Sequence, residues 1–227
     1  MPKYNPNKII RSDRKTIGIQ ITEKGEIIVR APKIATKESI HTVLSASEKW
    51  IEKKLNKIAQ QQARYKVKKF VPGEEFLYMG EKYKLVVAEK PINKVDLHDN
   101  LIISSKLAGN PKLARKALED WYREELRSFV NDKARQYAQN LEVEYKKIRI
   151  TGAKTRWGSC SGKKNLNFSW RLIMAPEEII DYVVVHELCH LREMNHSKRF
   201  WELVSTIVPD WKDKRKWFKE NGWLLRI

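Results

Sequence analysis

The stretch His186-Glu187-Leu188-Cys189-His190, with His196 a short distance further on, decides the fold that we expect for this chain. Residues four positions apart lie on one face of a helix, so His186 and His190 can direct imidazole nitrogens at a shared point. Glu187 lies beside this pair, where a carboxylate can hold a metal-bound water and accept its proton. The pattern H-E-x-x-H therefore predicts a zinc site with Glu187 as the catalytic general base.

A third ligand has to come from outside this motif, because a catalytic zinc has three protein ligands and one open position. We favour His196, and the alternatives are Glu202 and Glu220. A continuous helix would place His196 about 9 Å further along the axis than His190, at about 1.5 Å per residue. The helix must therefore stop between these two histidines.

Two residues are suited to such an interruption. Asn195 can adopt the left-handed conformation that often ends a helix, and we predict the stop there. Ser197 is a good N-cap for a following helix. Upstream of the motif, residues 179–185 are apolar on nearly all sides, which is typical of a buried helix. Buried histidines and glutamate are costly unless they serve a ligand, and this favours metal binding.

Several segments of the chain resemble the YgjP-like metallopeptidase family, which is related to the SprT-like zincins. The resemblance implies a zinc-dependent peptidase, with His186, His190 and His196 at the metal positions and Glu187 at the catalytic position. Glu193 stands where metzincins have a glycine, so the chain must leave the helix differently from those proteins. The segments that carry the resemblance are Arg14-Lys15-Thr16, Val29-Arg30-Ala31-Pro32, Thr155-Arg156-Trp157-Gly158-Ser159-Cys160-Ser161, Asn165-Leu166-Asn167, residues 184–190 and residues 196–201.

We expect an α+β fold in two parts, with a boundary near Gly109. Residues 1–109 are predicted to form a β-rich N-terminal region with one amphipathic helix. Residues 110–227 are predicted to form a zincin-like catalytic domain, in which a small antiparallel sheet packs on the H-E-x-x-H helix. A peptide substrate commonly adds to a sheet edge, and we expect that edge near residues 157–159 or 166–170.

Hydrophobic periodicity places the individual elements. Alternating apolar residues predict a hairpin over residues 16–30, and helical spacing from Thr36 predicts one amphipathic helix with Trp50 in the core. Asn110-Pro111 is a strong helix start, and the apolar stripe that follows predicts a helix of up to about 30 residues. Further strands are predicted at residues 76–79, 83–87, 94–97, 101–104, 146–151, 156–159 and 166–173.

Composition narrows the class of protein and its partners. The 46 Lys and Arg residues against 28 Asp and Glu residues give a net charge of +18, spread over both halves of the chain. Such a surface favours polyanions, so nucleic acid is a possible partner besides a protein or peptide substrate. We expect no secretory signal, no disulfide framework and no membrane span, which together favour a cytoplasmic location.

The two cysteines are treated separately. Cys189 is expected to be a small apolar residue of the helix, and Cys160 could approach the zinc only if its loop folds inward.

Zinc-dependent endopeptidase activity is the leading interpretation, and a different class stands beside it. In the alternative, the chain is a basic nucleic-acid-associated protein whose metal is structural or which acts on DNA-bound protein, as some SprT-like relatives do. An aminopeptidase would need an acidic residue for the substrate's free amine, and none stands out. The group that stabilises the oxyanion is also open among Arg156, Asn167 and several tyrosines.

Overall fold

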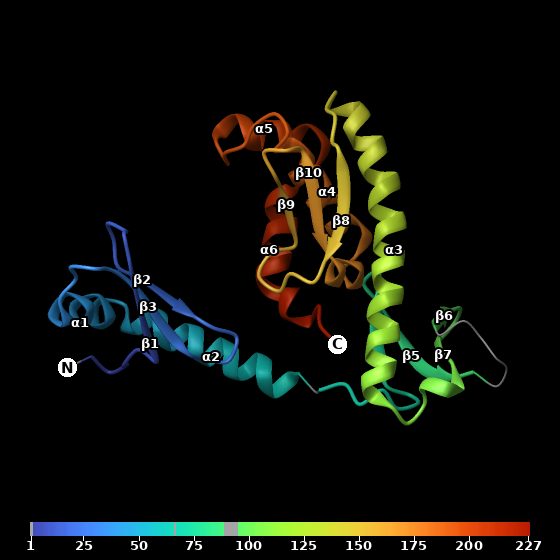
Figure 1. Ribbon diagram of the computed structural model, residues 1–227, viewed down its shortest axis with the longest axis horizontal. Coiled ribbons are helices and arrows are strands. Elements are labelled where there is room, and N and C mark those ends of the chain that lie inside the picture. The colour runs from blue at the N-terminus through green and yellow to red at the C-terminus, as the bar shows by residue number, and fades with distance from the viewer. Residues whose placement is uncertain (1, 66, 89–94) are drawn as a thin grey trace. The chain divides into compact units, whose positions relative to one another are not determined.

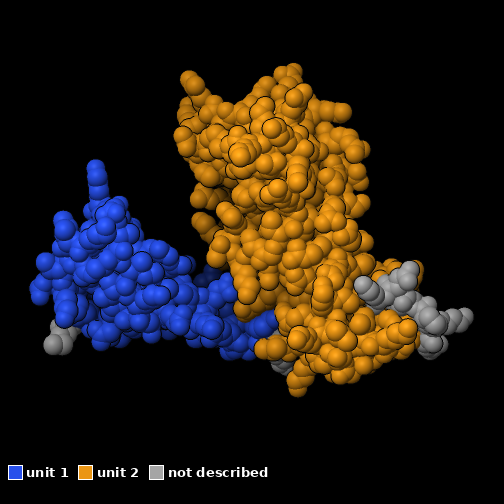
Figure 2. Space-filling model, in the orientation of Figure 1, with its two compact units in different colours: residues 1–66 blue, residues 67–227 orange. Residues whose placement is uncertain are grey.

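The computed structural model describes residues 2–65, 67–88 and 95–227. It contains helices and small sheets, as an α+β fold requires, and it divides into residues 1–66 and residues 67–227 (Figure 2). Each unit has its own cluster of buried apolar residues. The predicted boundary near Gly109 therefore falls inside the second unit, because Phe76, Leu85 and Ile103 belong to the core that also contains the long helix.

The N-terminal unit is built on a three-stranded sheet with the order β1-β3-β2. β2 and β3 are antiparallel, which confirms the predicted hairpin, and Gly25 turns it with a φ of 83°. β1 pairs in parallel with β3 and was not predicted. The strands are β1 (Lys8–Ser12), β2 (Gly18–Ile21) and β3 (Ile27–Pro32).

The single amphipathic helix predicted after Thr36 is two helices, α1 (Lys37–Ala46) and α2 (Glu48–Arg64). They meet at Ser47, whose backbone N–H bonds to carbonyls of the preceding turn. The break shifts the helical phase, so Trp50 is 45% exposed and the prediction that it lies in the core is wrong. Its neighbour Ile51 is fully buried instead.

The second unit begins with a four-stranded sheet of order β4-β5-β7-β6. The predicted strands are present, apart from Lys94, which lies outside the described residues. The Tyr122 hydroxyl donates to the Leu77 carbonyl at 2.5 Å, so the long helix is fastened to β4. The strands are β4 (Glu75–Tyr78), β5 (Glu81–Val87), β6 (Val95–Leu97) and β7 (Leu101–Ile103), and the turn η1 (Ser105–Leu107) follows.

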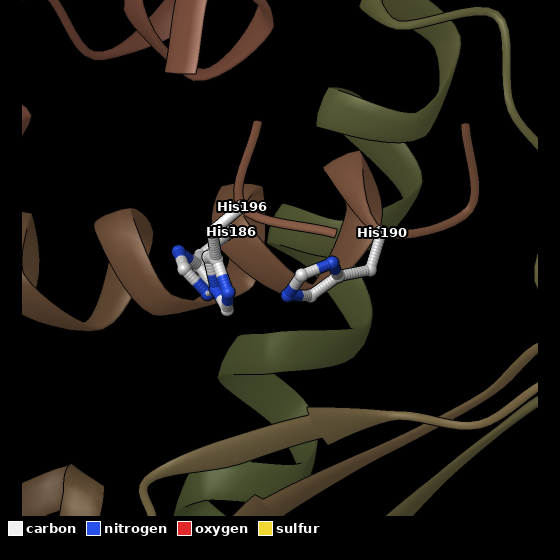
Figure 3. A group of neighbouring side chains, drawn as sticks. All are labelled: His186, His190 and His196. Atoms are coloured by element: carbon white, nitrogen blue, oxygen red, sulfur yellow. Dashed lines mark hydrogen bonds between the residues drawn. The ribbon is translucent and has the colours of Figure 1, made fainter. Parts of the chain in front are cut away.

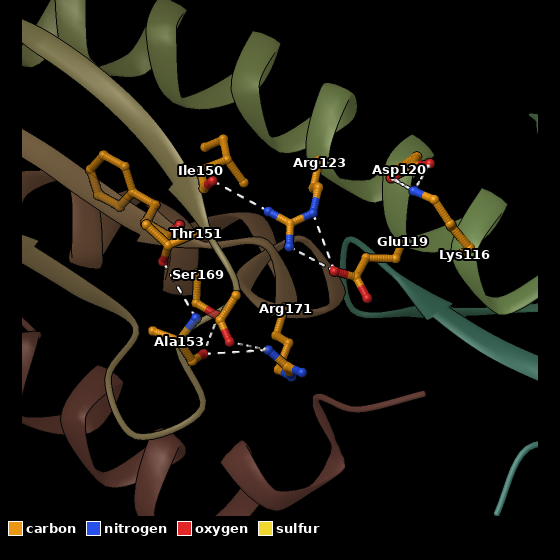
Figure 4. Close-up of polar contacts among 11 residues, drawn as sticks. Lys116, Glu119, Asp120, Arg123, Ile150, Thr151, Ala153, Ser169 and Arg171 are labelled. Carbon is orange, nitrogen blue, oxygen red and sulfur yellow. Dashed lines mark hydrogen bonds and ion pairs between the residues drawn. The ribbon is translucent and has the colours of Figure 1, made fainter.

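Helix α3 (Pro111–Asn140) has 30 residues and begins where the sequence predicts. The Asn110 side chain accepts a hydrogen bond from the Leu113 backbone N–H at 3.2 Å, which caps the helix. Figure 1 shows α3 running beside β8. Arg123 joins the two, since its guanidinium donates to the Ile150 carbonyl at 3.3 Å and pairs with Glu119 at 2.6 Å (Figure 4).

The sheet beside the predicted metal helix has the order β8-β10-β9. β10 is antiparallel to β9 but parallel to β8, so the sheet is mixed and not antiparallel as predicted. β10 lies in the middle, which excludes residues 166–170 as the free edge, whereas β9 is an edge strand. The strands are β8 (Lys147–Thr151), β9 (Gly158–Cys160) and β10 (Asn165–Ser169), and η2 (Trp170–Met174) replaces the end of the predicted third strand.

Helix α4 (Glu177–Cys189) carries the H-E-x-x-H motif and is buried on nearly all sides, as its apolar sequence predicts. The chain ends with α5 (Lys198–Ile207), α6 (Trp211–Asn221) and η3 (Gly222–Leu224). None of the helices in the part of the chain that the structure describes has both the length and the apolar character needed to cross a bilayer.

Candidate metal centre

Two of the predicted ligands come from the last turn of α4. The helix ends at Cys189 and His190 occupies the C-cap, so both histidines of the motif lie at its end. The predicted stop at Asn195 is wrong, because the helix ends well before it and Asn195 is not among the described residues with positive φ. The predicted N-cap is confirmed, since the Ser197 hydroxyl accepts from the Phe200 backbone N–H at 3.3 Å.

His186, His190 and His196 converge, with ligand nitrogens all within 4.8 Å of one another (Figure 3). The Nε2 atoms of His186 and His196 are 3.0 Å apart. A tetrahedral zinc with Zn–N distances of about 2.0–2.1 Å would separate two such nitrogens by roughly 3.3 Å, so the spacing suits a zinc ion. Glu202, Glu220 and Cys160 are not part of this group within the described chain.

His190 is oriented by a hydrogen bond of the kind that metal-binding histidines use. Its Nδ1 lies 3.0 Å from the Glu193 carbonyl oxygen, so Nδ1 donates and Nε2 is left as the ligand atom. Glu193, which replaces the glycine of metzincins, thus contributes through its backbone. His186 is also kept neutral, because burial, helped by the charges of His190, His196 and Arg215, lowers its pKa to about 3. Neutral imidazoles are the form that binds a metal.

Aromatic rings of α5 and α6 surround the three histidines. Phe200 is fully buried, and its ring centroid lies 4.5–4.9 Å from those of all three imidazoles. Trp201 stacks on His196 at 5.5 Å, and Trp211 stacks on Trp201 at 4.0 Å. His196 is the most exposed of the three histidines and lies beyond the end of α4, so this stack is what packs against its imidazole.

Glu187 is 5% exposed and lies against the edge strand β9. Burial raises the pKa of its carboxyl to about 8, although the backbone N–H of Cys160 donates to it. A carboxyl with a pKa near neutrality is suited to accept and release a proton.

Gly158 permits this approach of the strand to Glu187. A Cβ atom at residue 158 would lie 2.4 Å from Glu187 Oε1 and 2.7 Å from its Cγ, closer than real contacts allow. The sequence shows a glycine in the Trp-Gly-Ser-Cys segment but no sign of which side chain it makes room for.

A cavity of about 350 Å³ opens beside this centre. Its walls are mainly aromatic and apolar, and its charged groups are Glu187, Arg215 and Lys219. The sequence analysis did not single out Arg215, because its position in this wall depends on the packing of α6. The lining residues are Trp157, Gly158, Tyr182, Val183, His186, Glu187, Arg215, Phe218 and Lys219.

The residues considered for oxyanion stabilisation line two different cavities. Arg156 and Asn167 line a second, smaller cavity of about 170 Å³ among the ends of the strands. The Asn167 amide also donates to the Ser159 carbonyl and hydroxyl at 3.3 and 3.2 Å. Tyr182 lines the cavity beside Glu187.

The two cysteines do not take part. Cys189 is fully buried and Cys160 is partly buried, and both are free thiols. Burial raises the pKa of both thiols, to about 12 for Cys189, which keeps them protonated and unsuited to bind a metal.

Comparisons with known proteins place this geometry in context. A family model described as "YgjP-like, metallopeptidase domain" matches residues 15–221. Among curated proteins, the chain is similar to the UTP pyrophosphatase of Escherichia coli (strain K12), with 29% identity over 75 residues. The match covers 33% of this chain and 44% of that relative, so the chain spans less than half of the relative's length.

Two solved structures also resemble part of the chain. They are the metallopeptidase zymogens abylysin of Pyrococcus abyssi and jannalysin of Methanocaldococcus jannaschii, each with a TM-score of 0.37. The identities are 26% and 21%, and each match covers 40% of this chain and 93% or 88% of the other.

Proposed function

Since this chain belongs to the YgjP-like metallopeptidase family, we propose that it is a zinc-dependent endopeptidase with Glu187 as its general base. His186, His190 and His196 would hold the zinc through imidazole nitrogens. The observation that carries this proposal is the convergence of three imidazoles, with ligand nitrogens within 4.8 Å of one another, next to a buried carboxyl. A structural zinc is normally closed by four side chains, whereas three histidines leave a position open for water or substrate.

The chemistry needs both the metal and Glu187. A zinc ion bound here would supply a Lewis acid that lowers the pKa of a coordinated water to about 7 and polarises the substrate carbonyl. Glu187 would take a proton from the attacking water and pass it to the leaving amine. Its burial between α4 and Gly158 fixes its position and keeps bulk water from competing for that proton.

The edge strand β9 is the element along which an extended peptide would bind. β9 pairs with β10 on one side, and its first residue, Gly158, lies against Glu187. Main-chain hydrogen bonds to such an edge hold a peptide of any sequence in extended form. A crystal structure with a peptide-like inhibitor bound elsewhere would contradict this part of the proposal.

Metal analysis combined with a cleavage assay tests the proposal. We expect about one zinc per purified chain, cleavage of an unfolded protein such as casein, and loss of both in His196→Ala. Glu187→Gln should keep the zinc and lower the cleavage rate by about 10²–10⁴-fold, the usual contribution of a general base. Wild-type protein that binds zinc but cleaves neither casein nor peptides would refute endopeptidase activity.

A second candidate function is the hydrolysis of a nucleoside triphosphate. The E. coli relative is named a UTP pyrophosphatase, and two cations, Arg215 and Lys219, line the cavity beside Glu187. Release of pyrophosphate from UTP, measured in the same preparations and lost in Glu187→Gln, would favour this candidate. Absence of release, together with casein cleavage, would leave the peptidase proposal in place.

Association with nucleic acid stays a prediction that rests on the net charge of +18. Binding of duplex DNA with a steep salt dependence would support it. The cytoplasmic location likewise stays a prediction.

A further inference from the structure

Arg215 of α6 lies in the wall of the cavity of about 350 Å³ that Glu187 also lines, and it contacts the ring of Trp201. Its guanidinium carbon lies 5.5 Å from the centroid of the Trp201 ring, within the range of a cation–π contact. Trp201 itself stacks on His196 on the way to the metal centre. Arg215 therefore contacts the ring that stacks on His196, and it shares a cavity with Glu187.

The charge of Arg215 has no acidic partner among the residues that the structure describes. Two partly buried lysines of this unit are paired, by contrast: Lys214 with Asp210 at 3.1 Å and Lys133 with Glu177 at 2.7 Å. The one carboxylate in the cavity wall is Glu187, which the proposed chemistry already uses. Five N–H donors on a guanidinium that contacts the Trp201 ring suit recognition of a planar oxyanion.

We propose that Arg215 binds a carboxylate of the substrate next to the reacting bond, so that acidic peptides are preferred. The inference rests on the proposed peptidase function and specifies its substrate class. The carboxylate can come from an Asp or Glu side chain or from the C-terminus of a peptide. Both present the same fork of two oxygens to the guanidinium.

The walls of the cavity favour a carboxylate over a polyphosphate. Trp157 and Phe218 stack at 5.1 Å and, with Val183, form an apolar surface that fits the hydrocarbon part of an amino-acid side chain. The wall offers two cations, Arg215 and Lys219, which are fewer than the charges of a polyphosphate.

Binding measurements on a variant that does not turn over test the proposal. The zinc-loaded Glu187→Gln protein is titrated calorimetrically with amidated peptides that differ only by Glu, Gln or Lys beside a central apolar bond. A further arm uses the Gln peptide with a free C-terminal carboxylate. We expect the Glu peptide or the free-acid peptide to bind about tenfold more tightly than the neutral one, and whichever does identifies the source of the carboxylate.

The decisive comparison removes one positive charge at two neighbouring positions. Adding Arg215→Gln should abolish the tenfold preference and leave binding of the neutral peptide within twofold, whereas Lys216→Gln should leave the preference intact. Lys216 is exposed on the same helix and does not line the cavity. Each variant loses one positive charge, so the two have the same net charge. Arg215→Lys keeps the charge and should retain part of the preference, and zinc content is measured for every variant.

Several results would overturn the proposal. Equal losses in Arg215→Gln and Lys216→Gln would mean that bulk charge attracts the peptide. Equal losses for acidic and neutral peptides in Arg215→Gln would mean that Arg215 only packs against Trp201. If UTP binds in a way that depends on Arg215 and no peptide binds, the ligand of Arg215 is a phosphate group and not a carboxylate. Failure of wild-type protein to cleave peptides would refute the proposed function separately, because the titrations do not depend on turnover.

Discussion

Helix α4 contains one buried carboxyl group, Glu187, and one partly buried one, Asp181, and their partners differ. Asp181 has two partners on α3. Its Oδ2 accepts a hydrogen bond from the Tyr137 hydroxyl at 3.0 Å and lies 3.3 Å from Lys133 Nζ. Glu187 has no cation paired with it in the described chain, and a backbone N–H of β9 is the donor that reaches it. Burial raises the pKa of both carboxyls.

This difference separates a structural group from a functional one. The partners of Asp181 offset part of its desolvation and fasten α4 to α3, although its Oδ1 has no hydrogen-bond partner in the described chain. Glu187 has no side-chain hydrogen-bond partner in the described chain, and it lines a cavity together with His186, one of the three converging histidines. Buried polar groups are normally satisfied, so the carboxyl that lacks side-chain partners marks the place where a ligand is expected.

The largest expected effect comes from a substitution that displaces the Glu187 side chain but leaves residue 187 a glutamate. In Gly158→Ala, the new methyl group would overlap the Glu187 carboxyl and force it out of position. We expect casein cleavage to fall by about a hundredfold, because small displacements of a catalytic group cost about that much, with zinc content unchanged. Gly162→Ala is the control, since a Cβ at residue 162 meets nothing within 4 Å. Full activity in Gly158→Ala would contradict the role of Glu187.

The cost of burying Glu187 should appear in the stability of the metal-free protein. A carboxyl whose pKa is raised from 4.5 to about 8 contributes stability that is present at low pH and lost as pH rises through about 8. Metal-free Glu187→Gln should therefore exceed wild type in free energy of unfolding by a few kcal/mol at pH 8.5, and the difference should shrink towards pH 5. Urea unfolding at the two pH values measures this, and parallel pH profiles would contradict it.

A smaller effect is expected from the aromatic stack behind His196. Trp201→Leu removes the ring that stacks on this ligand, and we expect zinc affinity to fall by about tenfold, as for other groups that orient metal ligands. Trp201→Phe should recover most of the affinity. Trp50→Leu is the control, because Trp50 is half exposed in the N-terminal unit. Competition with a zinc-binding dye measures the affinity, and an unchanged value in Trp201→Leu would show that α4 alone positions the ligands.

The smallest effect is expected on the structural side of α4. Lys133→Met removes a cation from Asp181 and should lower the free energy of unfolding by about 1–2 kcal/mol, with zinc affinity unchanged. Lys116→Met, which breaks an exposed pair with Asp120, should cost less than about 0.5 kcal/mol. Thermal or urea unfolding compares the two. A loss of zinc affinity in Lys133→Met would remove the distinction between the two carboxyls.

Local signals in the sequence account for the features that were predicted correctly. Asn110-Pro111 sets the start of α3, the alternation after Thr16 sets the first hairpin, and Ser197 sets the start of α5. The spacing of the three histidines along the chain predicts their convergence, whereas their role as zinc ligands and that of Glu187 as general base stay predictions. Each of these depends on residues close together in sequence.

The features that were missed depend on contacts between distant segments. β8 pairs in parallel with β10, and β1 pairs in parallel with β3. The sequence of a strand does not show which other strand it pairs with. The role of Gly158 depends on its distance from Glu187, and that of Arg215 depends on a cavity formed by α4, α6 and the segment before β9. The break between α1 and α2 involves one residue, Ser47, but it changes the helical phase and so places Trp50 at the surface.

The two separate hydrophobic cores have a consequence for how such proteins can change over time. Residues 1–66 complete one core and residues 67–227 complete the other, so a single junction in the gene divides them. Recombination at that junction would transfer or delete the first part without removing any of the three converging histidines. Descendants of one ancestor could therefore exchange their N-terminal modules and inherit the same reaction centre.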